Sequence, residues 1–155
     1  MKLDKIDRRI LSELQSNGRM TNVDLAQKAG ISAPPCLRRV RALEEAGLIR
    51  GYFAKVDATA LGYGITVLAQ VKLNSHAEAD LRAFADIVAT WPLVRESYMI
   101  AGDSDFLLKI VAKDWDAYQR FLTDELTKYG NVSSVKSTLT IRTTKEEPGV
   151  PINVD

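Results

Sequence analysis

The spacing of the hydrophobic residues changes once along this chain, near Tyr63, and that change constrains the fold more than any other feature. Before it, apolar residues recur every three or four positions, as in amphipathic α-helices. After it, residues 65–73 (ITVLAQVKL) alternate apolar and polar side chains, as in a half-buried β-strand. A length of 155 residues suits one medium domain or two small ones. We therefore expect one domain at residues 1–62, a second at 63–147, and a loose C-terminal tail at 148–155.

The first domain is predicted to begin with two helices, because each apolar stretch has its own start and stop signals. The stripe of the first helix consists of Leu3, Ile6, Ile10, Leu11 and Leu14. Asn17 and Gly18 end this helix. Thr21 or Asn22 then caps a short second helix, which Gly30 ends.

A third helix is predicted to begin at Ser32, a further N-cap candidate, and to run to about residue 46. Pro34 and Pro35 fit its first turn, where backbone N–H groups have no helical partner. The following residues 48–57 (LIRGYFAKVD) are rich in β-formers and contain a glycine, which predicts a small hairpin. Three helices with a tight turn between the second and third, followed by a hairpin, form a winged helix-turn-helix pattern.

The second domain is predicted to be α+β, with the ferredoxin-like order βαββαβ. Its strands are residues 65–73, 93–102, 105–113 and 132–142, and the GDSD turn joins the middle two. One connecting helix presents Leu81, Phe84, Ala85 and Val88 on one face, and the other presents Trp115, Tyr118, Leu122, Leu126 and Tyr129. Helices cover only one face of such a sheet. The other face, with Leu68 and Val111, is left for a second copy of the chain.

Charge is distributed unevenly between the two domains. Residues 1–62 carry eleven Lys or Arg against seven Asp or Glu, a net charge of +4. Residues 63–155 carry ten against thirteen, a net charge of −3. The first domain is therefore the candidate for binding a polyanion.

Arginines cluster on the third helix. On a helical wheel of about 100° per residue, the apolar arc consists of Ala33, Cys36, Leu37, Val40 and Leu43. Arg38 lies opposite the centre of that arc, with Arg39 and Arg41 on its two flanks. Because small residues separate these cations, the helix can enter a DNA major groove, which is about 12 Å wide. An ordinary solvated helix face is the alternative, and the place of this helix as the second of a helix-turn-helix argues against it.

Three other side chains receive structural interpretations. Cys36 lies on the apolar arc and is expected to be a buried small hydrophobe rather than a redox or metal thiol. Glu44 lies at the edge of the arc and is expected to pair with a nearby arginine. His76, the only histidine, lies in a polar stretch before a predicted helix and is expected at the surface.

The sequence also argues against several classes of protein. No apolar run approaches the roughly 18 residues of a membrane helix, and the N-terminal residues lack the apolar region of a signal peptide. A single cysteine permits no internal disulfide or zinc cluster. We expect a cytoplasmic protein without cofactor or metal. No nucleophile elbow, P-loop or metal-ligand spacing favours an enzyme, although Asp103 and Asp105 are a conceivable acid–base pair.

Several stretches resemble one known family. Residues 3–19 (LDKIDRRILSELQSNGR), 25–32 (LAQKAGIS) and 36–52 (CLRRVRALEEAGLIRGY) resemble the N-terminal domain of the Lrp/AsnC family of transcription regulators. GDSDFLLK at residues 102–109 resembles the Gly-Asp-x-Asp-aromatic turn of that family's ligand-sensing domain. The resemblance extends from Leu3 to about Glu147. Ala33 departs from it, because the family more often has proline there.

The resemblance implies a sequence-specific DNA-binding regulator that dimerises through its second domain, often assembles into octamers, and responds to a small effector, typically an amino acid. A homodimer would place two recognition helices over a pseudo-palindromic site. The DNA-binding candidates are Thr21, Asn22, Ser32, Pro34, Pro35, Arg38, Arg39, Arg41, Arg50 and Lys55. Of these, Arg38 and Arg41 are expected nearest the bases, and the other cations nearest the phosphates.

The GDSD turn has two readings. As a hairpin turn, its glycine supplies positive φ and its aspartates cap neighbouring N–H groups. As an effector site, Asp103 or Asp105 would bind the ammonium group of an amino acid, and turn N–H groups its carboxylate. In similar proteins this turn lines the effector cleft with a stretch of the last strand, and another subunit completes it. The candidates are therefore Tyr98, Met99, Gly102, Asp103, Asp105, Thr138, Leu139 and Thr140.

Two further functions remain open from the sequence. A ligand-independent architectural protein that bridges DNA through an oligomer would have similar features, and an amino acid would not change its affinity for DNA. A helical module that contacts protein instead of DNA would lack the steep salt dependence of phosphate contacts.

Overall fold

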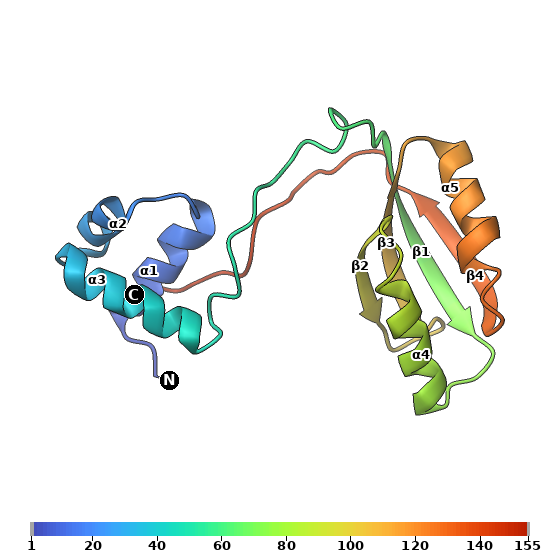
Figure 1. Ribbon diagram of the computed structural model, residues 1–155, viewed down its shortest axis with the longest axis horizontal. Helices are drawn as coiled ribbons and strands as arrows, with labels where there is room; N and C mark the ends of the chain where they lie inside the picture. The colour runs from blue at the N-terminus through green and yellow to red at the C-terminus, as the bar shows by residue number, and fades with distance from the viewer. Residues whose placement is uncertain (1, 155) are drawn as a thin grey trace. The chain divides into compact units, whose positions relative to one another are not determined.

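The structure, a computed structural model, describes residues 2–154 and contains two compact units (Figure 1). Unit 1 combines the described residues up to Lys55 with those from Lys145 onward, and unit 2 is Val56–Thr144. The division after Lys55 differs from the expected boundary near Tyr63. Residues 57–63 form a hydrogen-bonded turn, and the N–H of Gly64 donates to the carbonyl of Lys113, so this turn goes with unit 2.

Unit 1 contains the three expected helices, α1 (Lys5–Ser16), α2 (Asn22–Ala29) and α3 (Ala33–Glu45). Asp4 and Asp7 form a reciprocal capping box at the start of α1. Thr21 is the N-cap of α2, because its hydroxyl oxygen accepts the N–H of Asp24. Gly30 ends α2 in the left-handed region at φ 74°, which lets the chain turn directly into α3.

The core of unit 1 forms between the three helices. Its buried apolar side chains are Ile10, Leu25, Ala26, Ala29, Cys36 and Leu43. Cys36 has no exposed surface, which confirms its expected role as a small core residue, and burial raises the pKa of its thiol.

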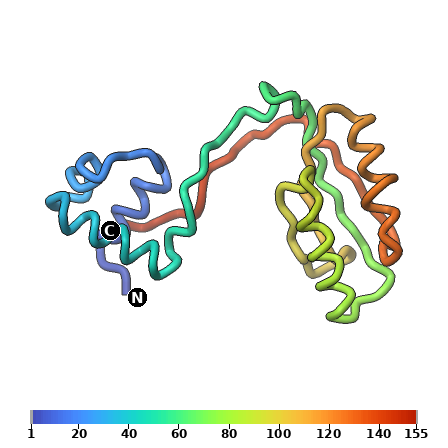
Figure 2. Tube along the Cα trace, viewed as in Figure 1, coloured from blue at the N-terminus to red at the C-terminus, as the bar shows by residue number. Residues whose placement is uncertain are grey.

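The expected hairpin after α3 does not form, since residues 48–57 contain no strand. The N–H groups of Leu48 and Ile49 instead donate to the carbonyl of Leu43 and close the end of α3. Figure 2 shows the segment after α3 running beside the C-terminal segment, and an ion pair of 2.9 Å joins Lys55 Nζ to Glu146 Oε2. The β-forming residues are thus extended without the local partner that a hairpin requires.

The C-terminal tail is not loose, contrary to the expectation. The side chain of Gln15 on α1 donates from Nε2 to the carbonyl of Val150 (2.7 Å) and accepts the N–H of Val150 (3.2 Å). Ile152 is half-buried against unit 1. The apolar side chain of Ile152 thus gives the tail surface to bury.

Unit 2 has the expected ferredoxin-like fold. Its strands are β1 (Ile65–Leu73), β2 (Val94–Met99), β3 (Phe106–Ala112) and β4 (Val132–Leu139). They form one antiparallel sheet in the order β2-β3-β1-β4. Helix α4 (Glu78–Val88) connects β1 to β2, and α5 (Trp115–Phe121) connects β3 to β4 and continues as a π-helical turn, Leu122–Leu126.

The two helices cover one face of this sheet (Figure 1). Val67, Ala69 and Val71 of β1 alternate inward and have no exposed surface, and Phe84 and Tyr118 from the helices pack onto them. The opposite face carries Thr66, Leu68 and Gln70 of β1, together with Leu107 and Val111 of β3, all at least partly exposed. Trp115, expected on the buried stripe of α5, is the first residue of that helix and is 43% exposed. Within residues 2–154, no helix combines the length and the apolar character that a bilayer span requires.

Candidate functional site

The outward face of α3 carries two exposed arginines. Arg38 and Arg41 are three positions apart, so their side chains project from the same side of the helix. Pro34, also exposed, lies one turn before Arg38. The carboxylates of α3, Glu44 and Glu45, lie in its last turn. The N-terminal two-thirds of this face therefore presents cations and small residues to solvent.

Arg39 does not share this face. It lies three positions after Cys36 and four before Leu43, the two fully buried residues of α3, and so projects from their side of the helix. Its Nη1 donates to Asp7 Oδ1 and Asp4 Oδ2, each at 2.7 Å. The Asp7 side chain is only 6% exposed, so Arg39 supplies the countercharge of a nearly buried carboxylate. The expected phosphate contact of Arg39 is therefore not supported by its geometry.

The same orientation of α3 accounts for Leu37. The sequence placed Leu37 inside the apolar arc, but its side chain is 39% exposed. Burial of α3 is centred on Cys36 and Leu43 instead, which moves Arg39 towards the core and Leu37 towards solvent. Seeing this from the sequence would have required knowing that Asp4 and Asp7, at the start of α1, face α3.

Two of the DNA-binding candidates, Asn22 and Thr21, form hydrogen bonds within unit 1 near the junction of α2 and α3. Asn22 donates from Nδ2 to the carbonyl of Ala33 (2.9 Å) and so ties the first turn of α2 to the start of α3. Thr21 is exposed, with its hydroxyl 2.6 Å from Asp24 Oδ2. Ser32 begins α3 without a side-chain cap hydrogen bond and is exposed, and Pro35 beside it is half-buried.

The segment after α3 carries three polar side chains, Arg50, Tyr52 and Lys55. Arg50 is exposed, and Lys55 is exposed but paired with Glu146. Glu44, expected to pair with an arginine, instead accepts a hydrogen bond of 2.9 Å from the hydroxyl of Tyr52. Desolvation, followed by this hydrogen bond to Glu44, raises the pKa of Tyr52 to about 12.

In unit 2, the GDSD turn lies at the end of β1 and is held by Asp105. Its Oδ2 accepts the N–H of Leu73 at 2.7 Å, and its own N–H donates to the carbonyl of Val71. Gly102 in this turn has φ 146° and is exposed, as is Asp103. Asp105 therefore has a structural role, whereas the carboxylate of Asp103 projects into solvent.

Sequence reasoning missed a partner of this turn. His76 Nε2 lies 3.2 Å from Asp105 Oδ1, although His76 itself is exposed as expected. The preceding Ser75 donates its hydroxyl to Asp80 and its N–H to the side chain of Asn131. The only available signal for the His76 contact was sheet topology, which places the end of β1 beside the start of β3.

The effector candidates form two separate groups. Tyr98 and Met99 end β2, which is one edge strand, and both are exposed; Thr138 and Leu139 end β4, which is the other edge. In the register of the sheet, Met99 is level with Val71 of β1, whereas Leu139 is level with Val67, four residues earlier in that strand. Three strand spacings and four residues along a strand separate them, which amounts to about 20 Å. One chain does not bring both groups to one amino acid.

The remaining candidate, Thr140, is engaged by its own chain. Its N–H and its hydroxyl both donate to the carbonyl of Thr66, each at 3.0 Å. Among residues 2–154, no group of three or more histidine, cysteine or acidic side chains is arranged to hold a metal ion.

Comparisons with known proteins agree on one class. Residues 3–50 match the family model described as a winged helix-turn-helix DNA-binding domain, and residues 66–150 match that of the Lrp/AsnC ligand binding domain. The leucine-responsive regulatory protein of Rhizobium meliloti is 53% identical over 98% of this chain and 97% of its own. That of Escherichia coli K12 is 35% identical over 93% of this chain and 88% of its own.

Solved structures give the same result. A transcriptional regulator of Neisseria meningitidis in complex with L-Met superposes with a TM-score of 0.93 at 35% identity, over 98% of both chains. An AsnC family regulator of Agrobacterium tumefaciens gives a TM-score of 0.90 at 33% identity, over 96% of this chain and 97% of that one.

Proposed function

The chain belongs to the Lrp/AsnC family of transcription regulators, and from this premise we propose that Arg38 and Arg41 read DNA bases while unit 2 binds an amino-acid effector. The family assignment makes the protein a regulator with a helix-turn-helix DNA-binding domain and a ligand-binding domain. One observation carries the residue assignment: the exposed face of α3 presents Arg38 and Arg41, and the only carboxylates of this helix, Glu44 and Glu45, lie in its last turn.

For the other DNA-binding candidates, the contacts of each side chain indicate whether it binds phosphate or supports the fold. Thr21, Ser32 and Arg50 are exposed and are proposed to contact phosphates. Lys55 joins them, because a surface ion pair is worth only about 0–1 kcal/mol and exchanges easily for a phosphate. Arg39 and Asn22 are proposed to support the fold of the DNA-binding unit instead.

On the effector side, Asp103 is the proposed partner of the ammonium group, because its carboxylate is exposed whereas Asp105 is engaged with Leu73 and His76. The Neisseria relative in complex with L-Met supports an amino acid as the effector class. Because the two groups of candidates lie about 20 Å apart in one chain, each site is proposed to combine the turn of one copy with the β4 end of another.

A homo-oligomer follows from that proposal. A dimer, which could assemble further into an octamer, would cover the open face of the sheet with a second copy and present two α3 helices to a pseudo-palindromic DNA site. Such a regulator would act in the cytoplasm, where its DNA is.

The proposal is tested by measuring DNA affinity with and without each of the twenty amino acids, on a duplex selected from a random-sequence library. We expect at least one amino acid to change the affinity, and log K to fall by about 0.9 per log unit of salt for each phosphate contact. An affinity that no amino acid alters would indicate an architectural DNA-binding protein. A flat salt dependence would argue against DNA as the partner of α3.

A further inference from the structure

We propose that residues 145–154 are a strap through which unit 2 acts on the DNA-binding unit. The strap is defined by its position: it follows unit 2 in the chain but belongs to unit 1. The two units are therefore joined covalently twice, once through the segment after α3 and once through the strap. The proposal that the strap transmits an effector signal depends on the effector site proposed above.

A side chain of α1 anchors the strap. Gln15 on α1 satisfies both backbone groups of Val150, donating to its carbonyl (2.7 Å) and accepting its N–H (3.2 Å). A β-ladder would satisfy the same two groups with backbone atoms, so Gln15 replaces a partner strand. Beside it, Gly149 adopts φ 66°, and a Cβ at this position would overlap the Gln15 amide. Only glycine permits this approach.

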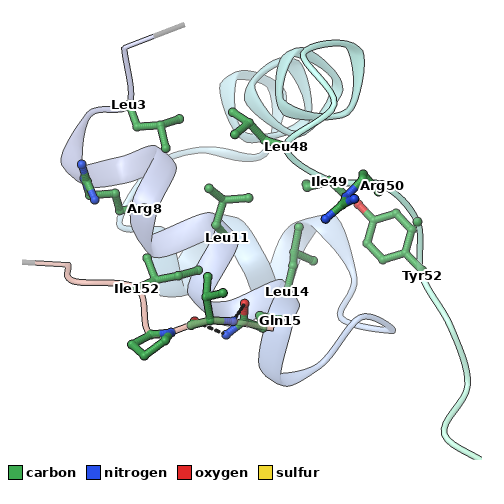
Figure 3. A pocket seen from close by; sticks show the side chains of 13 residues that line it. Leu3, Arg8, Leu11, Leu14, Gln15, Leu48, Ile49, Arg50, Tyr52 and Ile152 are labelled. Carbon is green, nitrogen blue, oxygen red and sulfur yellow. Dashed lines mark hydrogen bonds between the residues drawn. The ribbon is translucent and has the colours of Figure 1, made fainter. Parts of the chain in front are cut away.

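The residues at and after this anchor form one wall of a groove on unit 1. The groove has a volume of about 420 Å³ and lies between α1 and the segment after α3, where Leu11, Leu14, Leu48 and Tyr52 line it. Pro151 and Ile152 line it from the strap side, and Figure 3 shows Ile152 and Gln15 below Leu11. The strap thus buries apolar surface against the helix that supports α3, and it joins the segment that continues from α3.

A second contact lies nearer the start of the strap. Lys55 Nζ and Glu146 Oε2 form an ion pair of 2.9 Å. Both groups are largely exposed, so this pair adds orientation more than stability. It nevertheless ties the strap to the segment that leaves the DNA-binding unit.

The other end of the strap is close in sequence to the proposed effector contacts. β4 ends at Leu139, and Thr140 is fixed to Thr66 of β1 by two hydrogen bonds. Residues 141–144 alone separate Thr140 from the strap. An effector bound at residues 138–140 therefore acts on a strand end that continues almost directly into a segment docked on unit 1.

An effector can shift an equilibrium only through a difference in its affinity for the two states. In this proposal the states are strap docked and strap released, and the release frees α1 and the segment after α3 from a contact that restrains them. Reciprocity requires that DNA binding alter effector affinity by the same factor. The coupling is therefore measurable from either side.

The test compares the full chain with three variants: removal of residues 145–155, Gly149→Ala and Gln15→Ala. Gly130→Ala is the matched control, since nothing lies within 4 Å of a Cβ there. For each protein, DNA dissociation constants are measured with and without saturating L-methionine, or with whichever of the twenty amino acids changes the affinity of the full chain. Calorimetry measures effector binding directly. We expect the ratio of the two constants to fall to about one in the three variants and to stay unchanged in the control, while all five proteins bind the effector.

A truncated chain that binds the effector and retains the full ratio would overturn the strap as the coupling route. If no amino acid binds the full chain, the proposed effector site fails, and the strap is judged by hydrogen exchange. The Val150 amide should then exchange at least tenfold more slowly in the full chain than in Gln15→Ala. Equal exchange rates would show that the strap is not docked.

Discussion

Arg38 and Arg39 are neighbours in the sequence, yet they occupy different surroundings. Arg38 is exposed on the outward face of α3, whereas Arg39 donates to Asp7 and Asp4 on the side that faces α1. Residue type alone does not distinguish the two guanidinium groups. Their positions relative to the buried Cys36 and Leu43 do, because a helix repeats every 3.6 residues.

Replacing Arg38 should weaken specific binding more than non-specific binding. If Arg38 reads a guanine edge, Arg38→Ala should cost about 1–3 kcal/mol against the selected duplex and much less against random DNA. The measurement is a pair of binding isotherms at one fixed salt concentration. Equal losses on both DNAs would make Arg38 a phosphate contact instead.

Replacing Arg39 should instead lower the stability of unit 1. Arg39→Ala leaves the nearly buried Asp7 carboxylate without its countercharge, and the one-third exposure of Arg39 limits the expected loss to about 1–3 kcal/mol. Urea denaturation followed by circular dichroism measures it. Arg38→Ala on the same helix is the control, and it should change the free energy of unfolding by less than about 0.5 kcal/mol. Equal stability of the two variants would contradict the assignment.

Acid should remove part of the stability that Arg39 gives to unit 1. The N–H of Asp7 and then the guanidinium of Arg39 hold the pKa of Asp4 below its ordinary value of 3.8. A carboxyl whose pKa is lowered by folding stabilises the folded state above its unfolded pKa, and this stabilisation is lost as the pH falls through the folded value. The difference between the full chain and Arg39→Ala should therefore shrink below about pH 4.

At the scale of elements, local signals were enough to predict the helices and the sheet. Thr21 and Gly30 act within one helical turn of their own positions, and the alternation in β1 is a property of that strand alone. The segment after α3 and the C-terminal tail were wrongly predicted because their partners are far away in sequence. Gln15 and Val150 are 135 residues apart, and neither side chain indicates the other.

The contact between α3 and the segment that follows it should be visible in the titration of one tyrosine. Tyr52 has a pKa of about 12, raised from 10 by desolvation and by Glu44. Because folding raises this pKa, the stabilisation is complete below about pH 10, the value for the unfolded chain, and is lost as the pH rises towards 12. Ultraviolet difference titration of the full chain against Tyr52→Phe isolates this group from the other tyrosines.

Glu44→Gln provides the control for that titration, because it removes the carboxylate and leaves the tyrosine in place. The midpoint for Tyr52 should then move down towards 10, though not fully, since desolvation is the larger cause. A Tyr52 that titrates near 10 in the full chain would mean that the hydroxyl is free in solution.

At the scale of the whole molecule, the sequence identified the residues of the candidate effector site but not their separation. The GDSD turn and residues 138–140 are recognisable as motifs, and their distance depends on strand order and register. Strand order puts β2 and β4 on opposite edges of the sheet. Register then puts Met99 and Leu139 at different heights along the strands. A binding site made of both therefore belongs to an assembly of chains rather than to one chain.

Mixed assemblies test this directly. Asp103→Ala damages the turn half of the site, and Thr138→Val damages the strand half, so neither variant alone should bind the amino acid to which the full chain responds. In a mixed dimer, one composite site combines the intact turn of one copy with the intact β4 end of the other, while the second site carries both lesions. Co-expression of the two variants should therefore restore binding at a fraction of the full stoichiometry, as calorimetry would show. If each site lay within a single chain, every site in the mixture would carry one lesion, and no binding would return.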